Sequence, residues 1–170
     1  MEKGQFCMEA FFMIDTLTKK EKKTKQYETL FLQMNELMSS NENRISNMAN
    51  FTAAVKSSFG FFWVGFYIAE SSDLVLGPFQ GPVACTRITK GKGVCGSSWS
   101  KEKSIIVGNV HEFPGHIACS PESNSEIVIP LMKEGQCIGV LDIDSKEYDC
   151  FDEIDQLWLE KLCSCLIAVL

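Results

Sequence analysis

The sequence has none of the features that attach a protein to a membrane. No apolar run is long enough to cross a bilayer. Glu2, Glu9 and Asp15 interrupt the apolar residues near the N-terminus, unlike in a secretory signal. Positive charge is also scarce, because 16 Lys and Arg stand against 22 Asp and Glu, for a formal net charge of −6. A basic surface for nucleic acid or anionic lipid is therefore not expected, and we predict a cytoplasmic protein that binds neither.

The composition is that of an ordinary globular domain. The 170 residues are 45% hydrophobic and 22% charged, and this length suits one domain with its own core. Eight cysteines is a high number for a protein of a reducing compartment, where they serve in catalysis, in metal binding or as small buried side chains. They are Cys7, Cys85, Cys95, Cys119, Cys137, Cys150, Cys163 and Cys165.

Two helices are predicted in the N-terminal third of the chain. Residues 1–23 end in a lysine-rich run and are expected to form a poorly ordered leader, whereas residues 24–170 form a single domain. Apolar side chains from Tyr27 to Leu37 recur at helical spacing. A second helix is predicted over residues 43–58, with Asn41 or Asn43 as its cap.

The rest of the chain alternates short strands with turns. A short helix is predicted over residues 94–101, a long loop over 108–124, and a terminal helix over 151–170 capped by Asp149 or Asp152. The hairpin turns indicate an α+β fold, in which a mostly antiparallel sheet of five or six strands carries the N- and C-terminal helices on one face. The predicted strands are 61–68, 74–76, 84–88, 104–107, 126–132 and 137–143.

Three acidic residues stand in otherwise apolar strands. Asp142 and Asp144 point to one face of their strand, since side chains alternate, and the residues between them point to a core. With Glu126 on the neighbouring strand, they predict an acidic pocket for a small ligand that carries an amine. Alternatively, the two aspartates accept backbone hydrogen bonds in a turn.

Cys85, Cys95 and Cys119 lie in or beside loops and turns near these acids. A thiolate can attack an electrophilic sulfur, become a sulfenic acid and condense with a second thiol. The pattern therefore indicates redox chemistry on a small zwitterion. Zinc is the alternative, with His111, His116 and Cys119 as ligands together with Cys85 or Cys95. Their spacing follows no usual zinc pattern, and we expect no metal.

Several long motifs resemble the free methionine-(R)-sulfoxide reductase family of GAF domains. The resemblance extends from Tyr27 to the terminal helix and implies a GAF fold and an enzyme with no cofactor. It departs from the family at Thr89, Lys90 and Trp99, around a loop and the short helix, so we expect an altered pocket rim. The motifs are Trp63–Tyr67, Leu76–Gly81, Ala84–Ile88, Gly91–Gly96, Phe113–Cys119, Ser125–Leu131 and Gly139–Ser145.

The resemblance also implies roles for the three cysteines. Cys119 is the attacking thiolate, Cys85 resolves the sulfenic acid by forming a disulfide with it, and Cys95 is an accessory thiol. Thioredoxin is the implied reductant. Pairing of GAF helices makes a homodimer a candidate assembly.

The implied substrate contacts come from the strands and the long loop. Glu126 and Asp144 bind the sulfoxide oxygen, and Asp142 holds the ammonium. Trp63 walls the pocket for the S-methyl group with Tyr67 beside it, although an aromatic residue in this strand is also consistent with ordinary core. We further predict that backbone N–H groups of His116, Ile117 and Ala118 hold the substrate carboxylate.

Two other functions are consistent with a GAF domain. The first is a non-catalytic sensor that binds a small molecule, and the second is a thiol redox sensor whose disulfide is itself the output. Turnover distinguishes both from a reductase, because a sensor is oxidised once whereas an enzyme cycles.

Overall fold

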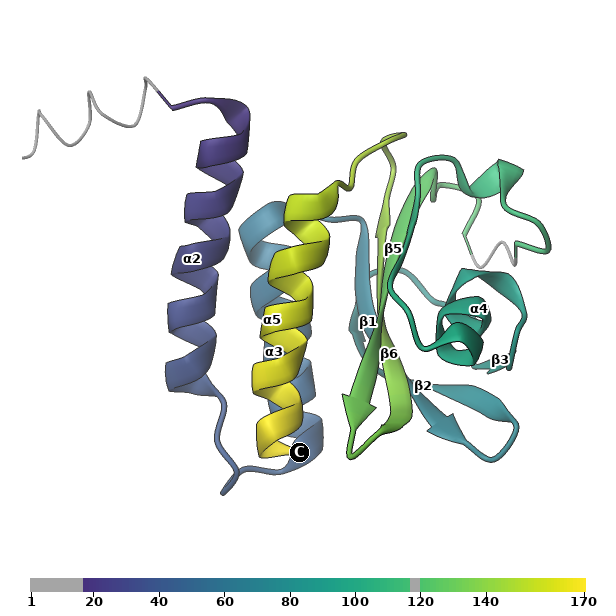
Figure 1. Cartoon of the computed structure of the whole chain (residues 1–170), viewed down its shortest axis with the longest axis horizontal. Helices are drawn as coiled ribbons and strands as arrows, with labels where there is room; N and C mark the ends of the chain where they lie inside the picture. Colours follow the sequence, from purple (N-terminus) through teal and green to yellow (C-terminus); the bar gives the residue numbers. More distant parts are fainter. Residues whose placement is uncertain (1–16, 117–119) are drawn as a thin grey trace, which may run out of the picture.

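A six-stranded antiparallel sheet separates two unequal layers of helices in the computed structural model, which describes residues 17–116 and 120–170. The strand order is β3-β2-β1-β6-β5-β4. Helices α3 (Arg44–Phe59) and α5 (Glu153–Val169) cover one face, and α2 (Lys19–Leu37) packs outside them (Figure 1). The short helix α4 (Gly93–Lys101) covers the other face, so the predicted α+β architecture is confirmed.

The helices begin where the sequence provides a side-chain cap. Thr18 and Glu21 form a capping box at the start of α2, and Asn43 accepts from the N–H of Ile45 at the start of α3. Asp152 caps α5 in the same way as Thr18 caps α2. Helix α2 therefore begins at Lys19, inside the segment that we expected to be a leader.

The strands agree with the predicted ones in number, but several are longer or shifted. Strand β2 continues through Gly77 and Pro78, which we had interpreted as punctuation, and β3 is confined to three residues. The β5–β6 hairpin turns at Glu134 and Gly135, both with positive φ, as a two-residue turn requires. The strands are β1 Trp63–Glu70, β2 Asp73–Gln80, β3 Arg87–Thr89, β4 Ile105–Val107, β5 Ser125–Lys133 and β6 Gln136–Ser145.

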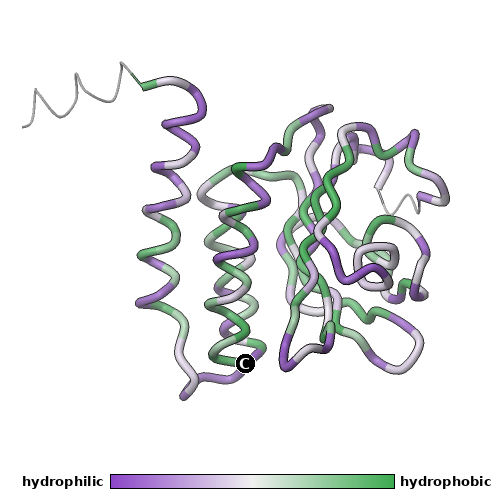
Figure 2. Tube along the Cα trace, in the orientation of Figure 1, coloured by the Kyte–Doolittle hydropathy of each residue, from purple (hydrophilic) through white to green (hydrophobic). Residues whose placement is uncertain are grey.

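The main hydrophobic core lies between the sheet and the three long helices. Leu141 and Ile143 of β6 are fully buried there. Figure 2 shows apolar residues along the strands and α5, whereas the first half of α2 is mainly hydrophilic. That half is fastened by charge: Lys23 pairs with the buried Asp155 at 2.6 Å, and the Tyr27 hydroxyl donates to the same carboxylate at 2.9 Å.

A second apolar cluster lies on the opposite face of the sheet, under α4. It contains Trp63, Tyr67, Val94 and Cys95, all at most 4% exposed. Trp99 is also buried there, with the Lys90 ammonium 4.7 Å from its ring centroid. Of the helices in the described part of the chain, none is long and apolar enough to span a membrane.

Candidate functional site

Strand register places the three predicted acids side by side on the α4 face of the sheet. Asp144 of β6 is paired with Trp63 of β1 on one side and with Glu126 of β5 on the other. Asp142 follows two residues earlier on β6 and therefore points to the same face. The residues between and before them, Ile143 and Leu141, enter the main core instead.

These side chains line one pocket between the sheet, α4 and the loop before β5. The empty space between these walls, up to the pocket mouth, is about 550 Å³, within the range of sites for small molecules. Seven predicted site residues line it: Trp63, Tyr67, Cys95, His116, Glu126, Asp142 and Asp144.

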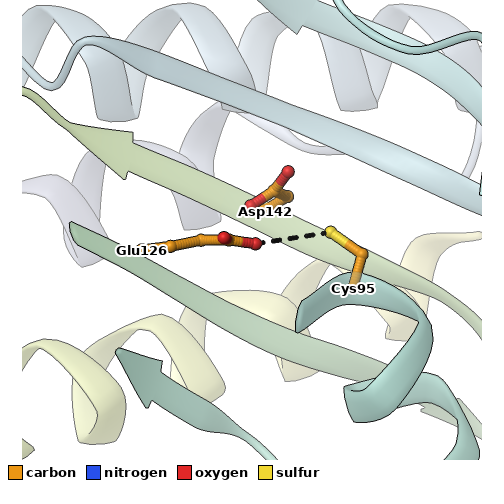
Figure 3. A group of neighbouring side chains, drawn as sticks. All are labelled: Cys95, Glu126 and Asp142. Atoms are coloured by element: carbon orange, nitrogen blue, oxygen red, sulfur yellow. Dashed lines mark hydrogen bonds between the residues drawn. The ribbon is translucent and has the colours of Figure 1, made fainter. Parts of the chain in front are cut away.

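The floor of the pocket is a cluster of a thiol and two carboxyls (Figure 3). The Cys95 thiol donates to Oε1 of Glu126 at 3.7 Å. One ligand-type atom from each of Cys95, Glu126 and Asp142 lies within 4.8 Å of the others, and all three residues are buried. Cys95 reaches the cluster because α4 begins two residues before it, at Gly93 with φ 60°.

One carboxylate oxygen in this cluster has no protein partner. Oδ1 of Asp142 is buried and has no hydrogen bond to any described residue, and the whole residue is 7% exposed. A buried oxygen without a donor is costly, and such groups in native proteins have a reason to be there. A cationic or N–H-bearing ligand group would satisfy it.

The acids differ in how strongly they are driven to the neutral form. Burial raises the pKa of Asp142 to about 6, so it is mostly ionised at pH 7. Burial and the neighbouring Asp142 charge raise the pKa values of Glu126 and Asp144 well above their ordinary range. All three acids are therefore driven toward the neutral form, in which a carboxyl group can donate a hydrogen bond as well as accept one.

Cys95 is held as a neutral thiol. Burial raises its pKa well above the ordinary value, and the charges of Asp142 and Glu126 add to the effect. A thiolate is the nucleophilic form of cysteine, so Cys95 is poorly suited to attack in this environment.

Trp63 forms the aromatic wall. Its Nε1 donates to the carbonyl of Pro82 at 3.0 Å, and its ring stacks on Tyr67 and Phe79 with centroids 6.0 and 5.4 Å away. A Cβ at Gly65 would overlap the indole, so this glycine provides the room that the ring occupies. The indole is thus fixed in orientation.

The long loop contributes differently from the prediction. The backbone N–H of His116 donates to the carbonyl of Phe113 at 3.0 Å and is not free for a substrate carboxylate. Its imidazole lines the pocket, and burial together with the His111 charge lowers its pKa, which favours the neutral ring. Ile117 and Ala118, the other predicted donors, lie outside the described residues.

The remaining cysteine predictions concern Cys85 and Cys119. Cys85 is disulfide-bonded, and its carbonyl accepts from the Tyr67 hydroxyl at 3.0 Å. Cys119, the predicted nucleophile and the predicted partner of Cys85, lies outside the described residues.

Sequence reasoning also missed some lining residues. Lys92, which precedes α4 in a Gly-Lys-Gly turn, lines the pocket, as do Ser120 and Ser123. The turn was visible in the sequence, but its proximity to the acids depends on the packing of α4. By contrast, Trp99, one of the departures from the family motifs, does not line the pocket.

Comparison with known proteins shows that most of the chain is similar to GAF-domain proteins. A profile of the GAF domain matches residues 48–166. Over 144 residues the chain is 56% identical to GAF domain-containing protein A of Dictyostelium discoideum, covering 84% of this chain and 91% of the relative. It is 43% identical to the free methionine-R-sulfoxide reductase of Escherichia coli over 149 residues, covering 87% and 90%.

Solved structures extend the same likeness to three dimensions. A free methionine-R-sulfoxide reductase from Neisseria meningitidis, determined in complex with its substrate, superposes with a TM-score of 0.83 at 46% identity. The match covers 86% of this chain and 89% of that one. The enzyme from Staphylococcus aureus in its reduced form gives a TM-score of 0.81 at 41% identity and covers 84% and 94%.

Proposed function

The chain belongs to the free methionine-R-sulfoxide reductase family of GAF-domain proteins, and on that premise we propose that it reduces free methionine-(R)-sulfoxide to methionine. The observation that carries the proposal is the pocket itself, in which two buried carboxyls, Glu126 and Asp142, and the half-buried Asp144 lie beside a fixed indole. A zwitterion with a polar sulfoxide and an S-methyl group matches each part of that lining.

The protonation pattern assigns a task to each acid. Asp142 is ionised near neutral pH, and its unpartnered Oδ1 accepts a hydrogen bond from the substrate ammonium. Glu126 and Asp144, whose pKa values are raised by burial and by the neighbouring Asp142, donate in their neutral form to the sulfoxide oxygen and protonate it as the S–O bond breaks. Trp63 packs against the methyl group.

The proposed chemistry begins at Cys119. Its sulfur attacks the sulfoxide sulfur, the oxygen is transferred to the cysteine, and methionine leaves as the reduced product while Cys119 becomes a sulfenic acid. The Cys85 thiol then displaces water from the sulfenic acid and forms a disulfide, which a dithiol such as thioredoxin reduces. The sum is one sulfoxide and one dithiol giving one methionine, one disulfide and one water. Such a reductant also favours a cytoplasmic location.

The pocket selects the free amino acid. A methionine sulfoxide residue within a peptide has no ammonium, so it would bury Asp142 without the group that compensates its charge. We expect near-zero turnover of N-acetylmethionine sulfoxide, and turnover comparable to the free amino acid would contradict the role of Asp142.

The direct test is a coupled assay. Purified protein is given free methionine-(R)-sulfoxide, thioredoxin, thioredoxin reductase and NADPH, and NADPH consumption is followed. We expect turnover by the wild type and by Cys137→Ser, whose sulfur is outside the pocket, and none by Cys119→Ser. Folded, reduced wild type without turnover would refute the reductase and favour a sensor, whose bound ligand mass spectrometry would identify.

A further inference from the structure

The thiol–carboxyl cluster on the pocket floor has a second chemical capacity besides substrate binding. Sγ of Cys95 and one oxygen each of Glu126 and Asp142 converge from α4, β5 and β6 (Figure 3). These are three ligand atoms of the kinds that divalent transition metals bind. Within the described ranges, this is the one such group of three.

The spacing of the ligand atoms matches a zinc coordination sphere. Zinc binds thiolate sulfur at about 2.3 Å and carboxylate oxygen at about 2.1 Å, so a tetrahedral site separates the two ligand atoms by about 3.6 Å. The observed separation of Cys95 Sγ and Glu126 Oε1 is 3.7 Å. No backbone movement is needed for these two ligands.

The third ligand residue, Asp142, also has an oxygen that the described protein leaves without a donor. Oδ1 of Asp142 is buried and has no hydrogen-bond partner among the described residues, and the residue as a whole is only 7% exposed. A cation in the pocket would satisfy it as well as the substrate ammonium does. The nearby Asp144 adds a further carboxyl to the same lining and favours a cation there.

The ligand set selects among ions. Calcium and magnesium prefer oxygen ligands alone, so the sulfur disfavours them. Zinc accepts one sulfur with two carboxylates, and a site with three protein ligands keeps its fourth position for water. Here that fourth position would face the pocket.

We infer that this pocket binds one zinc-type divalent ion through Cys95, Glu126 and Asp142, and that the ion excludes the amino-acid substrate. On binding, the Cys95 thiol releases its proton to solvent, and no redox change occurs. The ion acts as a reversible competitive inhibitor and not as a cofactor. The inhibitory part rests on the proposed function, whereas binding itself does not.

Cadmium is the probe for binding, because its bond to thiolate gives an ultraviolet charge-transfer band. Purified full-length protein is titrated with Cd²⁺, and the band that depends on Cys95 is the difference between wild type and Cys95→Ser. We expect one equivalent of Cd²⁺ to saturate this difference. Cys137→Ser, which changes another free thiol outside the pocket, should keep the full band. Asp142→Asn should weaken binding tenfold or more, roughly the loss seen for altered metal sites.

The outcomes separate the two proposals. A band equal in wild type and Cys95→Ser would overturn the metal site, even if the enzyme turns over normally. Displacement of Cd²⁺ by free methionine, together with Zn²⁺ inhibition that excess substrate relieves, is the expected result. A Cys95-dependent band that methionine does not displace would overturn the exclusion and contradict substrate binding at this cluster, while leaving metal binding established.

Discussion

The sheet strands pack mainly apolar side chains against α3 and α5, whereas their other face, covered by α4, carries carboxyls, a thiol and an indole. Strand β6 contributes to both, because Leu141 and Ile143 enter the first layer while Asp142 and Asp144 enter the second. The apolar face is stabilised by burial, at roughly 25 cal/mol for each Å² of apolar surface. The pocket face has acids whose raised pKa values mean that burial costs stability. The face under α3 and α5 thus provides most of the stability, whereas the face under α4 provides the pocket at a cost in stability.

The largest loss of stability is expected when an acidic residue replaces an apolar one at the neighbouring, core-facing position of β6. Leu141→Asp places an unpaired carboxyl in the main core, where Leu141 is fully buried, and we expect a loss of at least about 4 kcal/mol or failure to fold. The free energy of unfolding is measured by urea titration followed by circular dichroism. The matched control, Asp142→Leu, should fold. An unchanged urea midpoint for Leu141→Asp would contradict the assignment of faces.

Removing the charge of the pocket aspartate should have opposite effects on stability and activity. Asp142→Asn abolishes a carboxylate whose pKa is raised from 3.8 to about 6 by burial, so we expect the ligand-free protein to gain about 3 kcal/mol at pH 7. The same change should raise KM for free methionine sulfoxide by tenfold or more, roughly the loss when a charged hydrogen bond is removed. Urea titration and the coupled assay measure the two effects. A variant that is less stable and fully active would contradict this account.

A polar contact outside the pocket should show the reverse pattern. Tyr27→Phe removes the hydroxyl that donates to the buried Asp155 at 2.9 Å, while Lys23 still pairs with that carboxylate. We expect a loss of about 1.5 kcal/mol in the free energy of unfolding. Kinetic constants should equal those of wild type, since α2 lies outside the pocket. A changed KM would show that the two sides of the sheet are coupled.

A smaller effect is expected in the pH dependence of the free energy of unfolding, to which the buried Asp142 of the pocket face contributes. The folded-state pKa of Asp142, about 6, lies above the ordinary value of 3.8, so the folded protein binds more protons than the unfolded chain between these values. Stability therefore falls as pH rises through this window, and the Asp142 share from pH 5 to pH 7 is about 1 kcal/mol. The difference between wild type and Asp142→Asn, measured by urea titration at both pH values, isolates this share. A difference that is constant with pH would exclude it.

The sequence predicts the pocket acids better than it predicts what closes over them. Alternation along β6 was enough to place Asp142 and Asp144 on one face, because a strand has a fixed period of two. The caps at Asn43 and Asp152 were also visible, since their side chains act on the next turn of the chain. Such features depend on near neighbours alone.

Features that depend on distant packing were not predictable in this way. Lys23 holds α2 in place through an ion pair with Asp155 of α5, and these two residues are 132 positions apart in the sequence. The approach of Lys92 and Cys95 to the acids requires α4 to be docked on the sheet. The N–H of His116 was expected to be free because nothing in the sequence shows that Phe113 accepts from it.

The alternation in β6 also bears on how the hairpin finds its pairing. A slip of one residue would turn both aspartates toward α3 and α5 and bring Leu141 and Ile143 into the pocket. Two unpaired carboxyls would then enter hydrocarbon, so the misregistered hairpin is strongly disfavoured. The residues that form the ligand site therefore also specify the strand register during folding, before any ligand is present.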